Sequence, residues 1–196
     1  MTEAEYLAYD LAHEGRHEFV NGEVYAMAGG SAEHALATMN LGALLHGALR
    51  GGPCRVYSGD LRVRVDETGL YTYPDLTVIC GRAELAPTTP PCALNPRVVV
   101  EVLSASTEAY DRGAKASHYR RRPSIEAIVF VSTTEPRVEV HTRNLDGSWT
   151  LREATDGEIA VPPIGVSVPV AEIYAGFDAL AAAAESVDTM EATPRA

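Results

Sequence analysis

The sequence lacks any apolar run of the roughly 20 residues that a membrane-spanning helix needs. Its first residues include the acids Glu3 and Glu5, with no basic start followed by an apolar stretch, so no secretory signal peptide is predicted. Because both targeting features are missing, we expect a cytoplasmic protein with no membrane partner.

Cysteine is also scarce, with three residues at Cys54, Cys80 and Cys92. The count is odd, and no two of them have the short spacing of a zinc knuckle or of a redox pair. We therefore expect three reduced thiols, as is usual in the cytosol. The fold needs neither a disulfide nor a structural metal, because 196 residues with an apolar fraction of 46% bury a sizeable core.

Basic residues are few: 16 lysines and arginines stand against 27 acids, which gives a net charge of −11. This balance opposes a protein that coats nucleic acid, although screening beyond roughly 8 Å at physiological salt leaves room for a local basic site. Fifteen of the 16 basic residues are arginine, and the one lysine is Lys115. A lysine amine is a compact donor with a tunable pKa, unlike the planar guanidinium. Lys115 is therefore a candidate functional amine.

The N-terminal part of the chain predicts a helix, a hairpin and a second helix. Thr2 followed by Glu5 is a capping-box pattern that opens a short helix to about residue 13. The dipeptide Asn21-Gly22 separates two strand-like runs, which is the strongest local signal of a β-hairpin. Ser31 then caps a helix with apolar residues at helical spacing, and a pair of glycines ends it.

From residue 55 onward the pattern is mostly that of strands. Residues 98–103 are almost continuously apolar and predict a central strand that is buried on both faces. Serines and a threonine after this strand cap a helix to about Arg122, where Pro123 stops it. Further strands are expected at residues 55–57, 61–65, 73–79, 127–132 and 138–143, and then through Trp149.

These elements predict one α+β domain, residues 1–176, with a mixed β-sheet, an N-terminal helix and a β-hairpin. No internal repeat or long linker divides this stretch. Residues 177–196 are alanine-rich and then polar, so we expect a C-terminal tail that is partly disordered.

Two carboxylates in strand-like segments point to chemistry. Glu101 lies inside the apolar strand, where a carboxylate is costly to bury unless it is paired or binds a metal. Asp75 follows Pro74 at the start of another extended run. Two such acids and a lysine on the next helix suit phosphodiester hydrolysis, because the acids hold a divalent cation and the ammonium shares the transition-state charge. We expect Asp75 and Glu101 on adjacent strands with converging carboxylates.

At these residues the sequence resembles the Uma-type family of restriction endonucleases, a bacterial branch of the PD-(D/E)XK nuclease superfamily. The matching segments are residues 17–24 (HEFVNGEV), 58–65, 73–79 (YPDLTVI) and 98–119 (VVVEVLSASTEAYDRGAKASHY). The resemblance extends over roughly residues 5–175. It implies a restriction-endonuclease-like fold, in which helices flank a mixed sheet, and cleavage of DNA with Mg²⁺ or Mn²⁺.

The resemblance also implies roles for single residues. Asp75 and Glu101 are then metal ligands, and Val102 offers its backbone carbonyl to the metal. In the superfamily the lysine lies two residues after the glutamate, and here that position is Leu103, which has no donor. The resemblance implies that Lys115, on the following helix, replaces this lysine.

Four other residues have two open interpretations each. His34 and Glu18 are candidates for lining the pocket, His34 because it matches a histidine common in the family. Alternatively, His34 only caps or packs at the start of its helix. Glu18 and Glu23, which flank the Asn-Gly turn, are alternatively solvated charges of the hairpin. Asp60 is a third carboxylate or, as we favour, a turn residue.

The predicted helix of Lys115 carries further charges. Asp111 and Tyr119 share its face at four-residue spacing, so Asp111 is placed to orient the ammonium. The same helix carries four arginines, which suggests phosphate contacts on a locally basic face. The alternative is a solvated helix end with favourable cations near its C-terminus. These arginines are Arg112, Arg120, Arg121 and Arg122.

Three functions are compared. The leading hypothesis is a magnesium-dependent deoxyribonuclease with DNA as its partner, and pairing as a homodimer is left open. The alternative is a nuclease-fold module that binds nucleic acid or protein without cutting, which the acidic charge and the displaced lysine favour. The third is a structural protein whose buried carboxylates only pair with arginines. Clustering of Asp75, Glu101 and Lys115 around one site would exclude the third.

Overall fold

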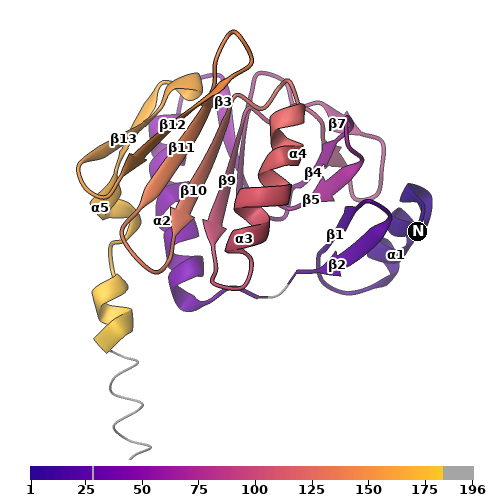
Figure 1. Cartoon of the computed structure of the whole chain (residues 1–196), viewed down its shortest axis with the longest axis horizontal. Helices are drawn as coiled ribbons and strands as arrows, with labels where there is room; N and C mark the ends of the chain where they lie inside the picture. The colour runs from indigo at the N-terminus through magenta and orange to yellow at the C-terminus, as the bar shows by residue number, and fades with distance from the viewer. Residues whose placement is uncertain (28, 183–196) are drawn as a thin grey trace, which may run out of the picture.

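The computed structural model describes residues 1–27 and 29–182. Within that part the strands form two six-stranded sheets and one two-stranded sheet, with helices packed against them (Figure 1). Sheet A has the order β2-β1-β5-β4-β8-β7, and sheet B has the order β12-β11-β10-β9-β6-β3. No helix in these residues is long and apolar enough to cross a membrane.

The expected mixed-sheet core flanked by helices is confirmed, but it is divided into two sheets. Sheet A consists of β1 (His17–Val20), β2 (Glu23–Ala26), β4 (Arg62–Val65), β5 (Leu70–Thr72), β7 (Leu85–Ala86) and β8 (Cys92–Ala93). Sheet B consists of β3 (Cys54–Ser58), β6 (Leu76–Cys80), β9 (Val98–Leu103), β10 (Ala127–Ser132), β11 (Val138–Arg143) and β12 (Trp149–Ala154). The division arises because β5, a strand that was not predicted, pairs with both β1 and β4 and draws the hairpin into sheet A.

Local signals account for the N-terminal elements. In α1 (Glu3–Ala12) the Thr2 hydroxyl accepts from the Glu5 N–H, and the Glu5 carboxylate accepts from the Thr2 N–H, so the capping box is confirmed. β1 and β2 pair antiparallel around Asn21 and Gly22, whose φ angles are +52° and +86°. A two-residue hairpin turn of this kind needs positive φ at both positions, which explains the Asn-Gly sequence.

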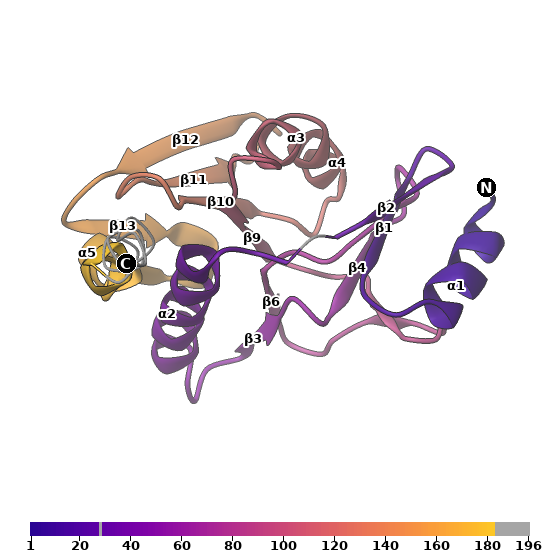
Figure 2. The ribbon, with the colours of Figure 1, turned by 90° about the horizontal axis from the view of Figure 1, so that it is seen from below.

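Sheet B is the centre of the molecule. Its strand β9 is buried along its whole length, runs parallel to β10 and pairs antiparallel with β6. One face is covered by α2 (Ala32–Ala48), and the other by a continuous helical segment of α3 (Glu108–Tyr110), the π-helical turn η1 (Asp111–Lys115) and α4 (Ala116–Arg121) (Figure 2). Val100 and Val102 pack on the α2 side, whereas Val99 and Leu103 pack against α4. Alternation along the strand therefore directs Glu101 toward α4.

Sheet A contacts α1 through a buried polar cluster in which one positive and one negative side chain pair. Arg62 Nη1 lies 2.7 Å from Asp10 Oδ2, and Tyr73 donates its hydroxyl to the same oxygen at 3.0 Å. His17 Nδ1 lies 3.1 Å from the other Asp10 oxygen, and Arg62 Nε lies 3.0 Å from Cys92 Sγ. One guanidinium thus faces one carboxylate, and both are nearly inaccessible to solvent. The arrangement holds the N-terminal helix on the sheet.

The C-terminal elements extend the core on the α2 side of sheet B. The strands β13 (Glu158–Val161) and β14 (Val166–Pro169) pair across the short 3-10 helix η2 (Pro162–Ile164), and α5 (Val170–Ile173) follows. Residues 177–182 are helical, and Phe177 packs partly buried against this core. The predicted tail at residues 177–196 therefore starts as a helix, and its remainder, residues 183–196, lies outside the described residues.

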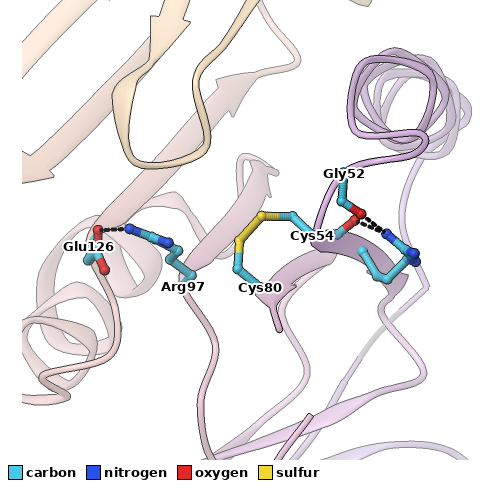
Figure 3. The surroundings of a disulfide bond; sticks show 6 residues. Gly52, Cys54, Cys80, Arg97 and Glu126 are labelled. Carbon is cyan, nitrogen blue, oxygen red and sulfur yellow. Dashed lines mark hydrogen bonds and ion pairs between the residues drawn. A yellow bond between two sulfur atoms is a disulfide. The ribbon is translucent and has the colours of Figure 1, made fainter. Parts of the chain in front are cut away.

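Cys54 and Cys80 form a disulfide, so the expectation of three reduced thiols is wrong (Figure 3). The two cysteines are 26 residues apart, but β3 and β6 pair antiparallel and place them directly opposite each other. Strand register brings them together, and cysteine spacing carries no information about register. Cys92 is free and buried. Because disulfides are rare in the cytosol, the cysteines no longer support the cytoplasmic expectation.

Reduction of the Cys54–Cys80 bond is expected to lower the free energy of unfolding by about 3 kcal/mol, because the crosslink restricts the unfolded chain. For a chain of this size, that loss lowers Tm by on the order of 10 °C. Thiol titration of the unfolded protein should find Cys92 alone before reduction and all three cysteines after it. The control is the variant C54S/C80S, whose Tm should not respond to reductant. Three reactive thiols without reductant would contradict the bond.

Candidate functional site

The helical segment after β9 contains a π-helical turn at its centre. The Ala116 amide donates to the Asp111 carbonyl, five residues earlier, where an α-helix would use a carbonyl four residues earlier. Single π turns inside α-helices are frequent at functional sites. This turn carries Asp111 and Lys115, and both side chains are buried. The sequence predicted a helix here but not its π turn.

Lys115 lies at the centre of three carboxylates. Its Nζ is 2.9 Å from Glu18 Oε1, 3.1 Å from Glu101 Oε1 and 3.4 Å from Asp111 Oδ1. Burial by itself lowers the pKa of this amine, but the neighbouring acids, Glu101 foremost, raise the pKa well above its usual value. Lys115 is therefore an ammonium ion. It joins three parts of the chain, because Glu18 belongs to sheet A, Glu101 to sheet B and Asp111 to the π turn.

Glu101 projects from β9 into the layer between sheet B and α4. Tyr119, four residues after Lys115, donates its hydroxyl to Glu101 Oε1. Burial raises the pKa of Glu101 to about 8, against the lowering effect of Lys115 and with the help of the charges of Asp75 and Asp111. The charged form of Glu101 is therefore costly unless a cation lies beside it.

Glu18 reaches the cluster from the N-terminal hairpin. All four residues of β1 are buried, so Glu18 is not a solvated hairpin charge. Thr72, on the neighbouring strand β5, donates its hydroxyl to the Glu18 oxygen that faces Lys115. By contrast Glu23 is exposed on β2, and Asp60 is an exposed turn residue with 88% of its side chain accessible. The hairpin sequence alone did not separate Glu18 from Glu23, because only the pairing with β5 buries β1.

Asp75 lies directly before β6 and not inside it. The sequence predicted a strand over residues 73–79, but Pro74 has no N–H to donate, and pairing begins at Leu76. The predicted adjacency of β6 and β9 is confirmed, with Leu76 opposite Val100. Asp75 Oδ2 accepts the Val102 N–H at 2.7 Å, so the carboxylate caps the end of the ladder between the two strands.

His34, in the first turn of α2, meets Asp75. Its Nε2 lies 3.3 Å from Asp75 Oδ1, and the two side chains are 20% and 19% exposed. The bond to Asp75 raises the pKa of His34, burial lowers it, and the Val102 backbone and the Asp111 charge raise it further. Gly30 leaves space for the ring, because a Cβ there would lie 2.6 Å from Nδ1. The His34–Asp75 pair is more exposed than the Lys115 cluster.

The site contains more acid than base. One ammonium and one imidazole are present with four carboxylates, those of Glu18, Asp75, Glu101 and Asp111. Such an excess of hard oxygen donors suits a divalent cation. In residues 1–27 and 29–182, no group of three or more His, Cys, Asp or Glu side chains is arranged to hold a metal ion. Mg²⁺, however, usually binds through one or two carboxylates and completes its shell with water and phosphate oxygens, so two acids meet its requirement.

Three of the four arginines near Lys115 have partners within the protein. Arg112 Nη1 lies 2.7 Å from Glu139 Oε2, Arg120 contacts a histidine of β11, and Arg122 pairs with acids of the β4–β5 turn. Arg121 is exposed and has no ion pair within the described part of the chain. Of the predicted phosphate contacts, Arg112 and Arg120 are therefore engaged elsewhere, and Arg121 is available.

Sequence comparisons agree with this fold. The chain matches the family model Uma2, described as "Putative restriction endonuclease", over residues 3–171. Uncharacterized protein slr1290 of Synechocystis sp. is 36% identical over 182 residues, which cover 90% of this chain and 93% of that protein. Uncharacterized protein sll1609 of the same organism is 31% identical over 153 residues, which cover 78% and 86%.

A solved structure has the same architecture. The crystal structure titled as a putative nuclease belonging to DUF820 from Anabaena variabilis aligns with a TM-score of 0.70, over 89% of this chain and 97% of that chain. At 13% identity this likeness shows the fold alone. The family match over residues 3–171, together with two relatives above 30% identity, shows that the chain belongs to the Uma2 family of restriction-endonuclease-type proteins.

Proposed function

We propose that this protein is a metal-dependent endodeoxyribonuclease that hydrolyses phosphodiester bonds of DNA at the Lys115 cluster. One observation carries the proposal: Lys115 and Glu101, from separate segments, are in contact, and Asp75 binds the neighbouring Val102 N–H and adds its charge at Glu101, so that acid is in excess. Family membership supports the reaction class. A cluster that served the fold alone would balance its charges, as Arg62 and Asp10 do beneath α1.

Asp75, Glu101 and the backbone carbonyl of Val102 are the groups that would hold a Mg²⁺ or Mn²⁺ ion. When bound, such an ion lowers the pKa of a water molecule and stabilises negative charge on the phosphate. The chain already orients both carboxylates: the Val102 N–H and His34 hold Asp75, and the Tyr119 hydroxyl holds Glu101. Ligands fixed in this way need little rearrangement on binding.

Lys115 would act on the charge of the reacting phosphate. Its ammonium has three N–H donors, and Glu18, Glu101 and Asp111 are their acceptors. When a phosphate oxygen or a water takes the place of one acceptor, the remaining acids still hold the amine in position. A donor held ready in a water-poor site stabilises developing charge more strongly than the same donor in solvent.

The alternative is a module on the nuclease fold that binds nucleic acid or protein without cutting. The net charge of −11 and the burial of Lys115, with 4% of its side chain exposed, favour this alternative. The site is more open at His34 and Asp75, each about one fifth exposed, and a scissile phosphate would approach from there. A cleavage assay with supercoiled plasmid and metal separates the two functions, because only the nuclease converts the plasmid to nicked and linear forms.

Mg²⁺ or Mn²⁺ is expected to stabilise the native protein through Asp75. At about ten times Kd, a cation stabilises the fold by about 1.4 kcal/mol, which raises Tm by roughly 3–6 °C. Asp75→Asn keeps an oxygen for the Val102 N–H but loses the charge, so its Tm should not rise. Asp60→Asn, in the exposed turn, is the matched control and should respond like wild type. Equal shifts in all three proteins would refute the metal site.

Lys115→Arg is expected to lower single-turnover cleavage of plasmid DNA at least ~10²-fold, the scale of one lost electrostatic donor. The planar guanidinium keeps the charge but does not fit as a point donor among three carboxylates. Lys115→Met removes the charge at similar length and should lose at least as much. The metal-induced shift of Tm, measured on each variant, reports whether the fold and the acids persist. Wild-type rates in Lys115→Arg would show that only positive charge matters at this position.

A further inference from the structure

A polar pocket of about 280 Å³ lies beside α4, outside the Lys115 cluster. Its walls come from three segments: the turn of the β1–β2 hairpin, the turn between β4 and β5, and one side of α4. The lining residues are Asn21, Glu67, Thr68, Ser117, His118 and Arg121. Most of these side chains carry hydrogen-bond donors, which is unusual in a chain with so many acids.

Arg121 is the cation of this pocket. Its neighbours on the helix, Arg120 and Arg122, have protein partners, whereas Arg121 has no ion pair in residues 1–27 and 29–182. The pocket also contains one acid, Glu67, which lies 3.4 Å from the Arg122 guanidinium and is therefore paired. The guanidinium of Arg121 is left as the unneutralised charge, and a guanidinium binds phosphate oxygens in a fork geometry.

His118 adds a second donor. Its Nδ1 is buried and, within the described residues, has no hydrogen-bond partner. Burial and the nearby charge of Arg121 lower the pKa of His118, so its ring is neutral and carries one N–H at neutral pH. The Ser117 hydroxyl and the Asn21 amide complete a set of neutral donors around Arg121.

The position of the pocket relates it to the proposed active site. Arg121 follows Lys115 by six residues, which is about 9 Å along a helix axis. This distance is on the order of the spacing between nearby phosphates of one strand, whose rise along the duplex axis is about 3.4 Å per nucleotide. We propose that the pocket binds a backbone phosphate of the nucleic-acid strand whose cleavage takes place at the Lys115 cluster, an inference that rests on the proposed function.

The test measures binding without cleavage. A fluorescein-labelled DNA duplex is titrated with wild type, Arg121→Gln and Arg152→Gln in the presence of chelator, over a series of salt concentrations. Arg152 is the matched control, because it is exposed on β12 opposite Val140 and so lies on the α2 side of sheet B. Arg121→Gln is expected to weaken binding about 10-fold and to reduce the slope of log K against log salt by about 0.9, the value for one phosphate contact. Arg152→Gln should change neither quantity.

Two outcomes would contradict phosphate binding by the pocket, and both are distinguishable from a failure to cleave DNA. If Arg121→Gln and Arg152→Gln bind DNA with the same affinity and salt slope as wild type, the pocket takes no backbone phosphate, whether or not the enzyme cuts. If wild type binds no DNA, inorganic phosphate replaces it, and the His118 ring resonances, assigned with His118→Gln, are followed by NMR. A shift in wild type that is absent in Arg121→Gln would show a phosphate pocket whose ligand is not DNA. No shift would overturn the pocket altogether.

Discussion

The buried ammonium of Lys115 is the interaction on which the architecture of the site depends. It lies within 3.4 Å of Glu18, Glu101 and Asp111, which come from sheet A, sheet B and the π turn. Three carboxylates at such close range repel one another, and their burial is costly without a cation among them. Removal of this one amine would leave uncompensated acids where the two sheets and the helix meet. The single lysine of the sequence therefore organises this site.

Apolar packing surrounds this polar centre and fixes its geometry. Val20 and Leu70 of sheet A pack with Val99 and Leu103 of sheet B and with the helix of Lys115 in one buried cluster. Leu103 occupies the position where the superfamily has its lysine, and it contributes to this packing instead. Leu103 on the strand thus supplies apolar contact, and the buried amine comes from the π turn. Rigid packing on both sides of the cluster keeps the carboxylates oriented.

Much of this was predictable from the sequence, and the failures have physical causes. Local signals succeeded: the Asn21 turn depends only on neighbouring residues, and the burial of Glu101 follows from the apolar run around it. Long-range pairing was not predictable, because the short strand β5 has no clear pattern, and it is β5 that buries Glu18 and divides the sheet. The Cys54–Cys80 bond likewise depends on the register of β3 with β6. The π turn inside the predicted helix was also missed.

The protein contains two buried ion clusters that can be compared, one beneath α1 and one around Lys115. Beneath α1, one guanidinium faces one carboxylate, and Arg62 and Asp10 are surrounded by further hydrogen-bond partners. Around Lys115 the acids outnumber the bases, and burial together with the neighbouring acids raises the pKa of Glu101 to about 8. A fold gains nothing from this excess, because each additional buried carboxylate adds a desolvation cost that a single ammonium does not offset. Perturbed carboxyls of this kind gather where a protein binds a cation or moves a proton. The imbalance therefore supports the proposal that the Lys115 cluster is an active site.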